Sequence, residues 1–171
     1  MSSSSIRHKA TAAQQGPVPI AIVTVSDTRT LATDTGGAAL VDMAIAAGHV
    51  IVDRQIVPDE PDPLSLILRQ YRDRGDIDAV LVTGGTGLGS RDQTFETVSH
   101  LITKPMPGYG ELFRMLSYAE IGSAAMLSRA VGGLMDRTVV LAMPGSRAAV
   151  VLAMEKLILP ELGHLVREAR R

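Results

Sequence analysis

Short apolar runs alternate with longer amphipathic segments from residue 20 onward. The runs are rich in β-branched and aliphatic residues, which is typical of strands buried in a sheet. They lie at 20–25, 50–57 (with a polar break at 53–55), 79–82 and 138–143. The amphipathic segments predict helices at 34–47, 62–74, 95–102, 108–118, 122–131 and 150–166. This alternation predicts a three-layer α/β/α fold with a mostly parallel central sheet.

Individual residues set several helix boundaries. Asp34 is suited to cap the first helix, because its side chain can accept hydrogen bonds from free N–H groups, and Gly48 ends that helix. Asp62 followed by Pro63 provides a cap residue and a first-turn proline for the second helix. Pro160 is expected to interrupt the last helix, because a proline removes a backbone hydrogen bond.

The first 19 residues differ from the rest of the chain. They are polar, include the run Ser2–Ser5, and lack the apolar segment of a secretory signal. We expect a flexible N-terminal tail over 1–19 and one domain over 20–171; the alternative is a tail that becomes ordered at a subunit contact. No apolar run reaches the roughly 20 residues needed to cross a bilayer. The sequence therefore predicts a cytoplasmic protein with no membrane partner.

Composition excludes several classes of function. Hydrophobic residues make up 46% of the chain but aromatic residues only 3%, which predicts an aliphatic core and few rings for stacking on bases. The formal net charge is -1, so a basic groove for nucleic acid is not expected. Because the chain has no cysteine, disulfides, thiolate zinc sites and cysteine nucleophiles are excluded.

The strongest chemical signal follows the run at 79–82. The run ends in Thr83-Gly84-Gly85-Thr86-Gly87, and a carboxylate, Asp92, follows within a few residues. A bare-backbone loop after a buried strand lets amide N–H groups converge on a phosphate. The loop matches neither common template, because Ser90 replaces the third glycine of a dinucleotide fingerprint and Ser90-Arg91 replaces the Lys-[ST] of a Walker A loop. It predicts a phosphate-binding loop of another kind, with a purely structural turn as the alternative.

Two carboxylates are candidates for holding Mg²⁺ on that phosphate. Asp92 lies beside the glycine-rich loop, where the alternative is that it caps the helix starting near Thr94. Asp59 lies between two prolines at the end of the second strand, where a simple turn residue is an equal alternative. The sequence alone leaves both alternatives open.

The expected topology adds further candidates, because ligands of an open parallel sheet bind beyond the carboxyl ends of its strands. The loops that start at Ser26, at Pro58, at Thr83 and at Pro144-Gly145-Ser146 are expected to converge there. The last of these could offer N–H groups to an anion at a helix N-terminus, or it could be an ordinary strand-to-helix turn.

The segment after residue 107 contains less specific candidates. Arg129, next to Ser128, could hold a phosphate with its forked guanidinium; a solvated surface arginine is the alternative. Glu111 and Arg114 are three residues apart, so a surface ion pair on a helix is the simplest interpretation.

Taken in order, these motifs resemble the molybdenum-cofactor biosynthesis family, which includes the bacterial Mog and MoaB proteins and the G-domains of gephyrin and its plant counterpart. The resemblance extends from Ile20 to about Leu162, and the segment 108–121 is most similar to the MoaB branch. The resemblance rests on these motifs: Ser26-Asp27-Thr28-Arg29, Asp34-Thr35-Gly36, Pro58-Asp59-Glu60, Thr83–Gly87, Arg91-Asp92-Gln93-Thr94, Pro107-Gly108 with Glu111 and Arg114, Ala125–Arg129 and Met143–Ser146. The chain departs from many relatives at 147–149, where Arg-Ala-Ala replaces Pro-Lys-Ala.

The resemblance implies a molybdopterin-binding fold, a homo-oligomer (a trimer, or a hexamer in the MoaB branch) and a nucleotidyltransferase reaction. Molybdopterin and Mg-ATP would give adenylyl-molybdopterin and pyrophosphate. It implies catalytic and metal-binding roles for Asp59 and Asp92, and some MoaB proteins that lack the first aspartate look inactive. It implies substrate or nucleotide contacts for Ser26, Thr83, Gly84, Gly85, Thr86, Gly87, Glu111, Ser128, Arg129, Pro144, Gly145 and Ser146. A non-catalytic molybdopterin carrier and a structural scaffold are the alternatives.

Overall fold

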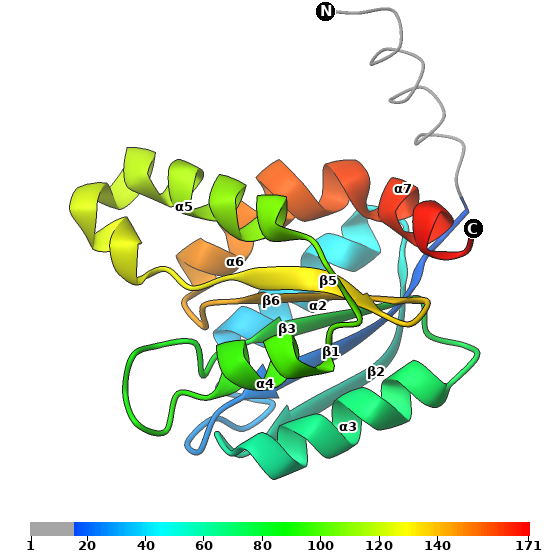
Figure 1. Ribbon diagram of the computed structural model, residues 1–171, viewed down its shortest axis with the longest axis horizontal. Coiled ribbons are helices and arrows are strands. Elements are labelled where there is room, and N and C mark those ends of the chain that lie inside the picture. Colours follow the sequence, from blue (N-terminus) through cyan, green and yellow to red (C-terminus); the bar gives the residue numbers. More distant parts are fainter. Residues whose placement is uncertain (1–15) are drawn as a thin grey trace, which may run out of the picture.

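One sheet of six strands runs through the computed structural model, which describes residues 16–171 (Figure 1). In pairing order the strands are β2 (Val50–Val57), β1 (Pro19–Val25), β3 (Ala79–Thr83), β6 (Thr138–Met143), β5 (Val131–Met135) and β4 (Lys104–Pro105). The first four pair in parallel, whereas β5 pairs antiparallel with both β6 and β4. The predicted α/β fold with a mostly parallel sheet is confirmed.

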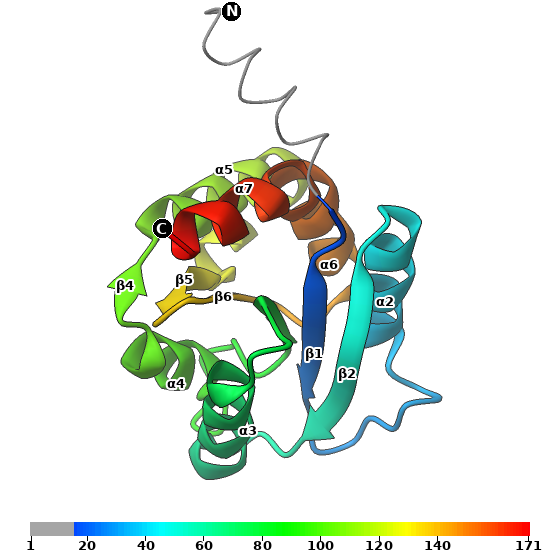
Figure 2. The same ribbon diagram turned by 90° about the vertical axis from the view of Figure 1, so that its right-hand side faces the viewer.

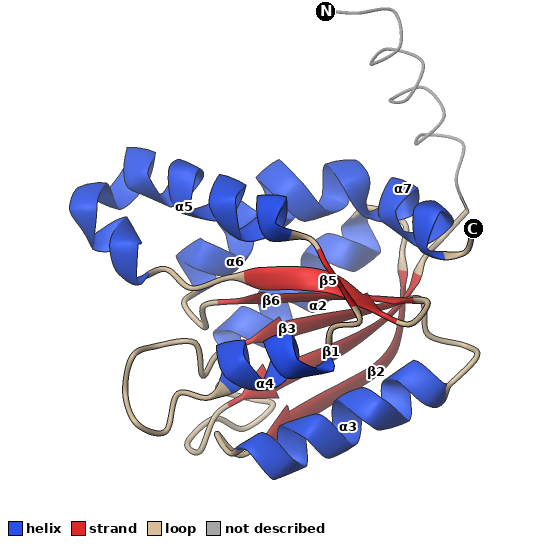
Figure 3. Ribbon diagram, viewed as in Figure 1, coloured by secondary structure: helices blue, strands red, loops and turns tan. Residues whose placement is uncertain are grey.

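Helices cover both faces of this sheet, as Figure 2 and Figure 3 show. One layer contains α2 (Thr35–Ala46), α5 (Pro107–Ile121), α6 (Arg147–Ala153) and α7 (Leu159–Ala169); the other contains α3 (Pro61–Asp73) and α4 (Thr94–Leu101). A 3-10 helix, η1 (Gly122–Leu127), follows α5, and a π-helical turn, η2 (Met154–Ile158), joins α6 to α7. Alternate strand residues face the two layers, so that Ile20 and Ile22 pack in one core and Ala21 and Val23 in the other.

The second strand is confirmed over Val50–Val57, and it continues through its polar residues 53–55. Asp53, Arg54 and Gln55 stay within β2 because β2 forms the edge of the sheet and its polar side chains find partners. The carboxylate of Asp53 accepts a hydrogen bond of 2.9 Å from the hydroxyl of Tyr71 on α3. Arg54 reaches the N-terminus of α2 on the other face.

The helix predicted at 122–131 is also wrong. The segment forms η1 and then β5, whose two glycines concealed the strand pattern in the sequence. A Cβ on Gly132 would lie 2.6 Å from the side chain of Leu141, and one on Gly133 would lie 2.5 Å from the carbonyl oxygen of Lys104. These glycines let β4 and the core approach a short strand closely.

The remaining helices begin close to their predicted positions. Asp34 caps α2, as predicted, because its side chain accepts a hydrogen bond from Gly37 N–H. The predicted Asp62 cap is wrong, because α3 begins at Pro61 and its N-cap is Glu60, two residues earlier, without a side-chain cap bond. The last helical segment begins at Arg147 and changes to a π turn before Pro160, which lies in the first turn of α7.

The predicted tail over 1–19 falls mostly on residues 1–15, which lie outside the described residues. Val18 is only 4% exposed and Pro19 begins β1, so the last part of that range belongs to the folded domain. Within 16–171, no helix is both long enough and apolar enough to span a bilayer.

Candidate functional site

Four loops meet at the carboxyl ends of the parallel strands, as expected from the sequence. The N–H of Gly84 donates to the carbonyl of Met143 over 3.2 Å, which joins the ends of β3 and β6. The N–H of Ser26 donates to the carbonyl of Val57 over 2.9 Å, which joins the ends of β1 and β2. The chain leaves β1 toward α2 and β3 toward α4, on opposite faces of the sheet. The site therefore lies at a topological switch point, where α/β sheets open a crevice.

The start of α2 and the loops after β3 and β6 approach one another through their backbones. We call this place the glycine junction (Gly36, Gly84 and Gly145). Gly84 has φ +95°, and a Cβ on it would lie 2.3 Å from the carbonyl oxygen of Val25. A Cβ on Gly145 would lie 3.1 Å from the Cα of Gly84, and one on Gly36 would lie 3.0 Å from the oxygen of Gly145. The junction brings the start of α2 and the turn before α6 against the glycine loop (residues 83–92).

Within the glycine loop, Gly85 leaves room for two polar side chains. Its φ is +61°, and a Cβ on it would lie 2.3 Å from Oγ1 of Thr94 and 2.7 Å from Oδ1 of Asp59. Both of these oxygen atoms are buried and have no hydrogen-bond partner within residues 16–171. Buried polar atoms without partners are rare in proteins and need a ligand, an ion or a water.

The carboxylate of Asp59 is destabilised in its charged form. Burial raises its pKa, and the negative charges of Asp92 and Asp27 raise it further, while Gln93 N–H and the Arg91 guanidinium act in the opposite direction. The net effect is a raised pKa. A cation at this position would relieve the repulsion between Asp59 and Asp92.

Asp92 does not cap the following helix, so that alternative is wrong. The N-cap of α4 is Gln93, without a side-chain cap bond. The carboxylate of Asp92 instead accepts a hydrogen bond of 2.9 Å from the N–H of Gly89. A Cβ on Gly87 would lie 2.7 Å from Oδ2 of Asp92, so the carboxylate packs directly on the loop backbone.

The donor set fits Mg²⁺ better than a metal held wholly by protein. Within the described residues, no group of three or more His, Asp or Glu side chains is placed to hold a metal ion. Mg²⁺ typically uses one or two carboxylates and completes its shell with water and substrate phosphate oxygens. Asp59, with its unpartnered oxygen, and Asp92 supply two carboxylates beside a loop suited to phosphate.

The loop backbone is open to an anion. Hydrogen bonds from Thr94 N–H to Gly85 (2.9 Å) and from Asp92 N–H to Gly89 (3.0 Å) close the loop. Over residues 16–171, by contrast, no protein acceptor is found for the N–H groups of 85–88. Such groups are the donors that a phosphate would use.

Arg129 contacts the carbonyl oxygens of this loop rather than its free N–H groups. Its Nε donates to the carbonyl of Thr86 over 2.8 Å, and its Nη2 donates to the carbonyls of Gly87 and Asp92. Its Nη1 pairs with the carboxylate of Glu96. The side chain is only 20% exposed, so the surface-arginine alternative is wrong. Most of its N–H donors are used by the loop and by Glu96, and a direct phosphate contact stays a prediction.

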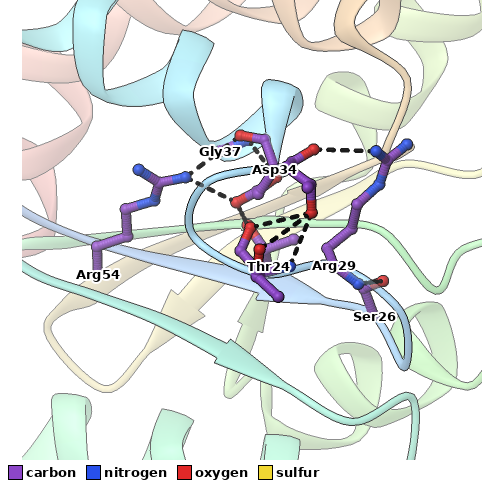
Figure 4. A network of polar contacts seen from close by, with 8 residues as sticks. Thr24, Ser26, Arg29, Asp34, Gly37 and Arg54 are labelled. Atoms are coloured by element: carbon purple, nitrogen blue, oxygen red, sulfur yellow. Dashed lines mark hydrogen bonds and ion pairs between the residues drawn. The ribbon is translucent and has the colours of Figure 1, made fainter.

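A second polar network fixes the start of α2, beside the β1 loop (Figure 4). The buried carboxylate of Asp34 accepts hydrogen bonds from Thr24 (2.7 Å), Gly37 N–H (2.8 Å) and Arg54 (2.9 Å). Burial alone would raise the pKa of Asp34, but these three donors outweigh burial and lower it. Sequence reasoning identified the cap but missed Arg54, because nothing in β2 signals a partner 20 residues away.

Ser26 shapes the loop that follows β1. Its Oγ accepts hydrogen bonds from the N–H groups of Thr28 (3.2 Å) and Arg29 (3.1 Å). A cavity of about 480 Å³ lies beside this loop and is lined by it and by the end of β2, including Arg54 and Pro58.

Ionic contacts tie the loop tips together. Arg91 pairs with Asp27 over 2.9 Å and approaches Glu60 at 3.7 Å. The side chain of Asp27 also accepts a hydrogen bond of 3.1 Å from the N–H of Asp59. The β1, β2 and β3 loops are thus connected across the crevice.

The other predicted residues are placed less directly. Ser146 caps α6, since its Oγ accepts a hydrogen bond of 3.2 Å from Ala149 N–H, and Ser128 ends η1. Glu111 is exposed on α5; within 16–171 no hydrogen bond or ion pair joins it to the glycine loop, and no ion pair joins it to Arg114. The interpretation of Glu111 and Arg114 as a surface ion pair is therefore wrong.

A mostly parallel sheet with a bare-backbone loop and two carboxylates at its switch point defines an α/β domain with a candidate ligand site at the carboxyl ends of its strands. The chain belongs to the family of probable molybdopterin binding domains, whose profile matches residues 21–164. It is 52% identical over 151 residues to Molybdenum cofactor biosynthesis protein B of Bacillus anthracis, covering 88% of this chain and 89% of the relative.

Solved structures agree with this family assignment. A crystal structure of a Molybdenum cofactor biosynthesis protein B has a TM-score of 0.90 at 50% identity and covers 92% of this chain and 98% of its own. The tungsten cofactor synthesizing protein MoaB from Pyrococcus furiosus has a TM-score of 0.80 at 32% identity, with coverage of 91% and 98%. The resemblance inferred from the sequence motifs is confirmed.

Proposed function

We propose that the protein acts in molybdenum-cofactor biosynthesis as a molybdopterin adenylyltransferase that uses Mg-ATP and releases pyrophosphate. One observation carries this proposal: the buried, unpartnered Oδ1 of Asp59 lies against Gly85 of a loop whose free N–H groups suit a phosphate. The family membership and the names of the relatives supply the molybdopterin substrate.

The reaction joins two anions and needs no covalent intermediate on the protein. A terminal phosphate oxygen of molybdopterin would attack the α-phosphorus of ATP; the bond from that phosphorus to the bridging oxygen would break, and pyrophosphate would leave. Bound Mg²⁺ would supply charge neutralisation on the phosphates, with Asp92 and Asp59 as its protein ligands.

This chain's own groups would hold the substrates in line. The N–H groups of 85–88 would bind a phosphoryl group of ATP, because they face no protein acceptor. The cavity of about 480 Å³ beside Ser26 is large enough for a further part of a substrate. Ser128, Glu111 and the 144–146 turn stay predictions from the resemblance, without a specific contact assigned.

We also propose that the protein is a homo-oligomer, a trimer or a hexamer, and that it works in the cytoplasm. Large apolar side chains gather on α5 and η1 and face solvent; they are Leu112, Met115, Tyr118, Ile121, Met126 and Leu127, with exposed fractions between 46% and 78%. Exposed apolar clusters of this kind are typical of contact surfaces between subunits.

The test is pyrophosphate release from molybdopterin, ATP and Mg²⁺. Wild-type protein should release pyrophosphate, and Asp92→Ala should lower turnover about 100- to 1,000-fold while the circular dichroism spectrum stays unchanged. Asp62→Ala, an exposed carboxylate in the first turn of α3, serves as the control and should keep full turnover. Molybdopterin binding without any pyrophosphate would instead support the carrier alternative.

A further inference from the structure

The guanidinium of Arg129 is surrounded by backbone carbonyls of the glycine loop. It donates to Thr86, Gly87 and Asp92, three oxygen atoms that belong to one side of the loop. In a trans peptide the C=O of one residue and the N–H of the next point in opposite directions. Contacts that hold these carbonyls therefore turn the N–H groups of the following residues toward the other side.

Two of the four N–H groups assigned to the phosphate follow carbonyls that Arg129 holds. The peptides that follow Thr86 and Gly87 carry the N–H groups of Gly87 and Leu88, for which residues 16–171 offer no acceptor. The peptide that follows Asp92 carries the N–H of Gln93, which interacts with the carboxylate of Asp59. One side chain thus contacts three peptides of the loop at their carbonyl side, opposite the N–H groups of Gly87, Leu88 and Gln93.

We propose that Arg129 is the positioning residue that sets the anion-binding shape of the glycine loop, without touching substrate itself. This inference deepens the proposed function and rests on it for the identity of the ligand, a nucleoside triphosphate with its Mg²⁺. It replaces the direct phosphate contact expected for Arg129 from the sequence.

Lysine could not fill this role, because the contacts need several donors in one plane. Nε and Nη2 reach three carbonyls, while Nη1 is held by Glu96 of α4. The guanidinium also stacks over the ring of Phe95, 5.1 Å from its centroid. A planar fork is thus fixed on two sides, whereas a lysine ammonium offers three donors from a single point.

The backbone of the neighbouring residue is fixed independently. The carbonyl oxygen of Ala130 would lie 2.4 Å from a Cβ on Gly110, so α5 packs directly on the chain beside Arg129. Arg129 therefore reaches the loop from a rigid base outside the loop. Positions on rigid elements give a site more precise geometry than a loop can give itself.

Hydrogen–deuterium exchange of the full-length protein tests this inference without any substrate. In Arg129→Lys, the hydrogen-bonded amides of Gly89, Asp92 and Thr94 should exchange at least about tenfold faster than in wild type, while exchange in β1 and β6 stays unchanged. A peptide covering 84–94 reports these amides. Arg72→Lys is the matched control, since Arg72 is 28% exposed, pairs with Asp73 and Asp136, and lies at the far end of α3. Its 84–94 amides should exchange as in wild type.

Calorimetric titration with Mg-ATP gives the second measurement. Arg129→Lys should raise the dissociation constant about tenfold, and Arg72→Lys should leave it unchanged. If Arg129→Lys does not fold, Glu96→Ala decides, because it removes the side-chain acceptor that holds the guanidinium. Faster exchange confined to 84–94 supports the inference, and unchanged exchange overturns it.

The two proposals fail separately. Unchanged loop exchange in folded Arg129→Lys overturns the positioning role, whatever the activity. A wild-type protein that releases no pyrophosphate overturns the adenylyltransferase proposal, while a loosened loop in Arg129→Lys would still establish what Arg129 does.

Discussion

The backbone of Gly85 lies directly against the carboxylate of Asp59: a Cβ at this glycine would stand 2.7 Å from Oδ1. That oxygen is buried and has no partner within 16–171, so a side chain at residue 85 would fill the space beside it.

Gly85→Ala should therefore abolish Mg-ATP binding, as measured by calorimetry, because the methyl group would occupy the position beside Asp59 and Thr94. The positive φ should add a stability cost of about 1–2 kcal/mol. Gly48→Ala is the control: its φ is +84° but its Cβ would meet nothing within 4 Å. It should show only the loss of stability that comes from the positive φ, and normal binding. Normal binding by Gly85→Ala would contradict the site.

Asp59→Asn should make the protein more stable at neutral pH and inactive. The pKa of Asp59 is raised, so the fold favours its protonated form; that contribution to stability is present in acid and is lost as the pH rises through the raised pKa. The amide removes the charge, so the increase in Tm should be largest near pH 8 and should shrink toward pH 4. Asp42→Asn, at an exposed site on α2, should change Tm little at either pH.

Thermal melts with and without Mg²⁺ extend this test. Wild-type Tm should rise on adding Mg²⁺, because the cation offsets the repulsion between Asp59 and Asp92, and Asp59→Asn should respond less. An equal response in both proteins would exclude Asp59 as a ligand.

Asp34→Ala should lower the free energy of unfolding by about 2–3 kcal/mol, as measured by urea denaturation at pH 7. The substitution removes a buried helix cap and the carboxylate that accepts hydrogen bonds from Thr24 and Arg54. The pKa of Asp34 is lowered, so its contribution is present above the ordinary carboxyl pKa and is lost as the pH falls through the lowered value. The difference from wild type should thus narrow in acid. Ser146→Ala removes an exposed cap and should cost only about 0.5–1 kcal/mol.

Met115→Glu should disrupt the proposed oligomer, because a charge in a buried apolar contact is costly. Light scattering after size-exclusion chromatography should show a smaller mass than for wild type. Leu66→Glu is the matched control, since Leu66 and Met115 are both 60% exposed but Leu66 lies on α3, in the other layer. The same mass for wild type and Met115→Glu would place the subunit contact elsewhere.

The sequence predicts those parts of the fold that depend on local pattern. The uniformly apolar strands β3 and β6 and the Asp34 cap were predictable because burial and capping leave signals within a few residues. β5 was not, because Gly132 and Gly133 are selected by the close approach of Lys104 and Leu141, which are distant in the chain.

In the site too, local residue patterns were predictable and contacts between distant residues were not. The glycine loop and its two aspartates stand out as residue types. The role of Arg129 does not, because its partners lie 33 to 43 residues earlier and three of them are backbone oxygens, which carry no side-chain signal. The unpartnered oxygen of Asp59 is likewise a property of packing rather than of composition.

The glycine junction limits how this protein can vary. Gly145 is exposed, yet any side chain on it meets the Cα of Gly84, so solvent exposure does not bring the usual freedom to mutate. An aliphatic core tolerates substitutions that conserve side-chain volume. Where three backbones are in contact, there is no side chain to replace and no room to add one. A saturation mutagenesis library should thus find the exposed position 145 less permissive than much of the hydrophobic interior.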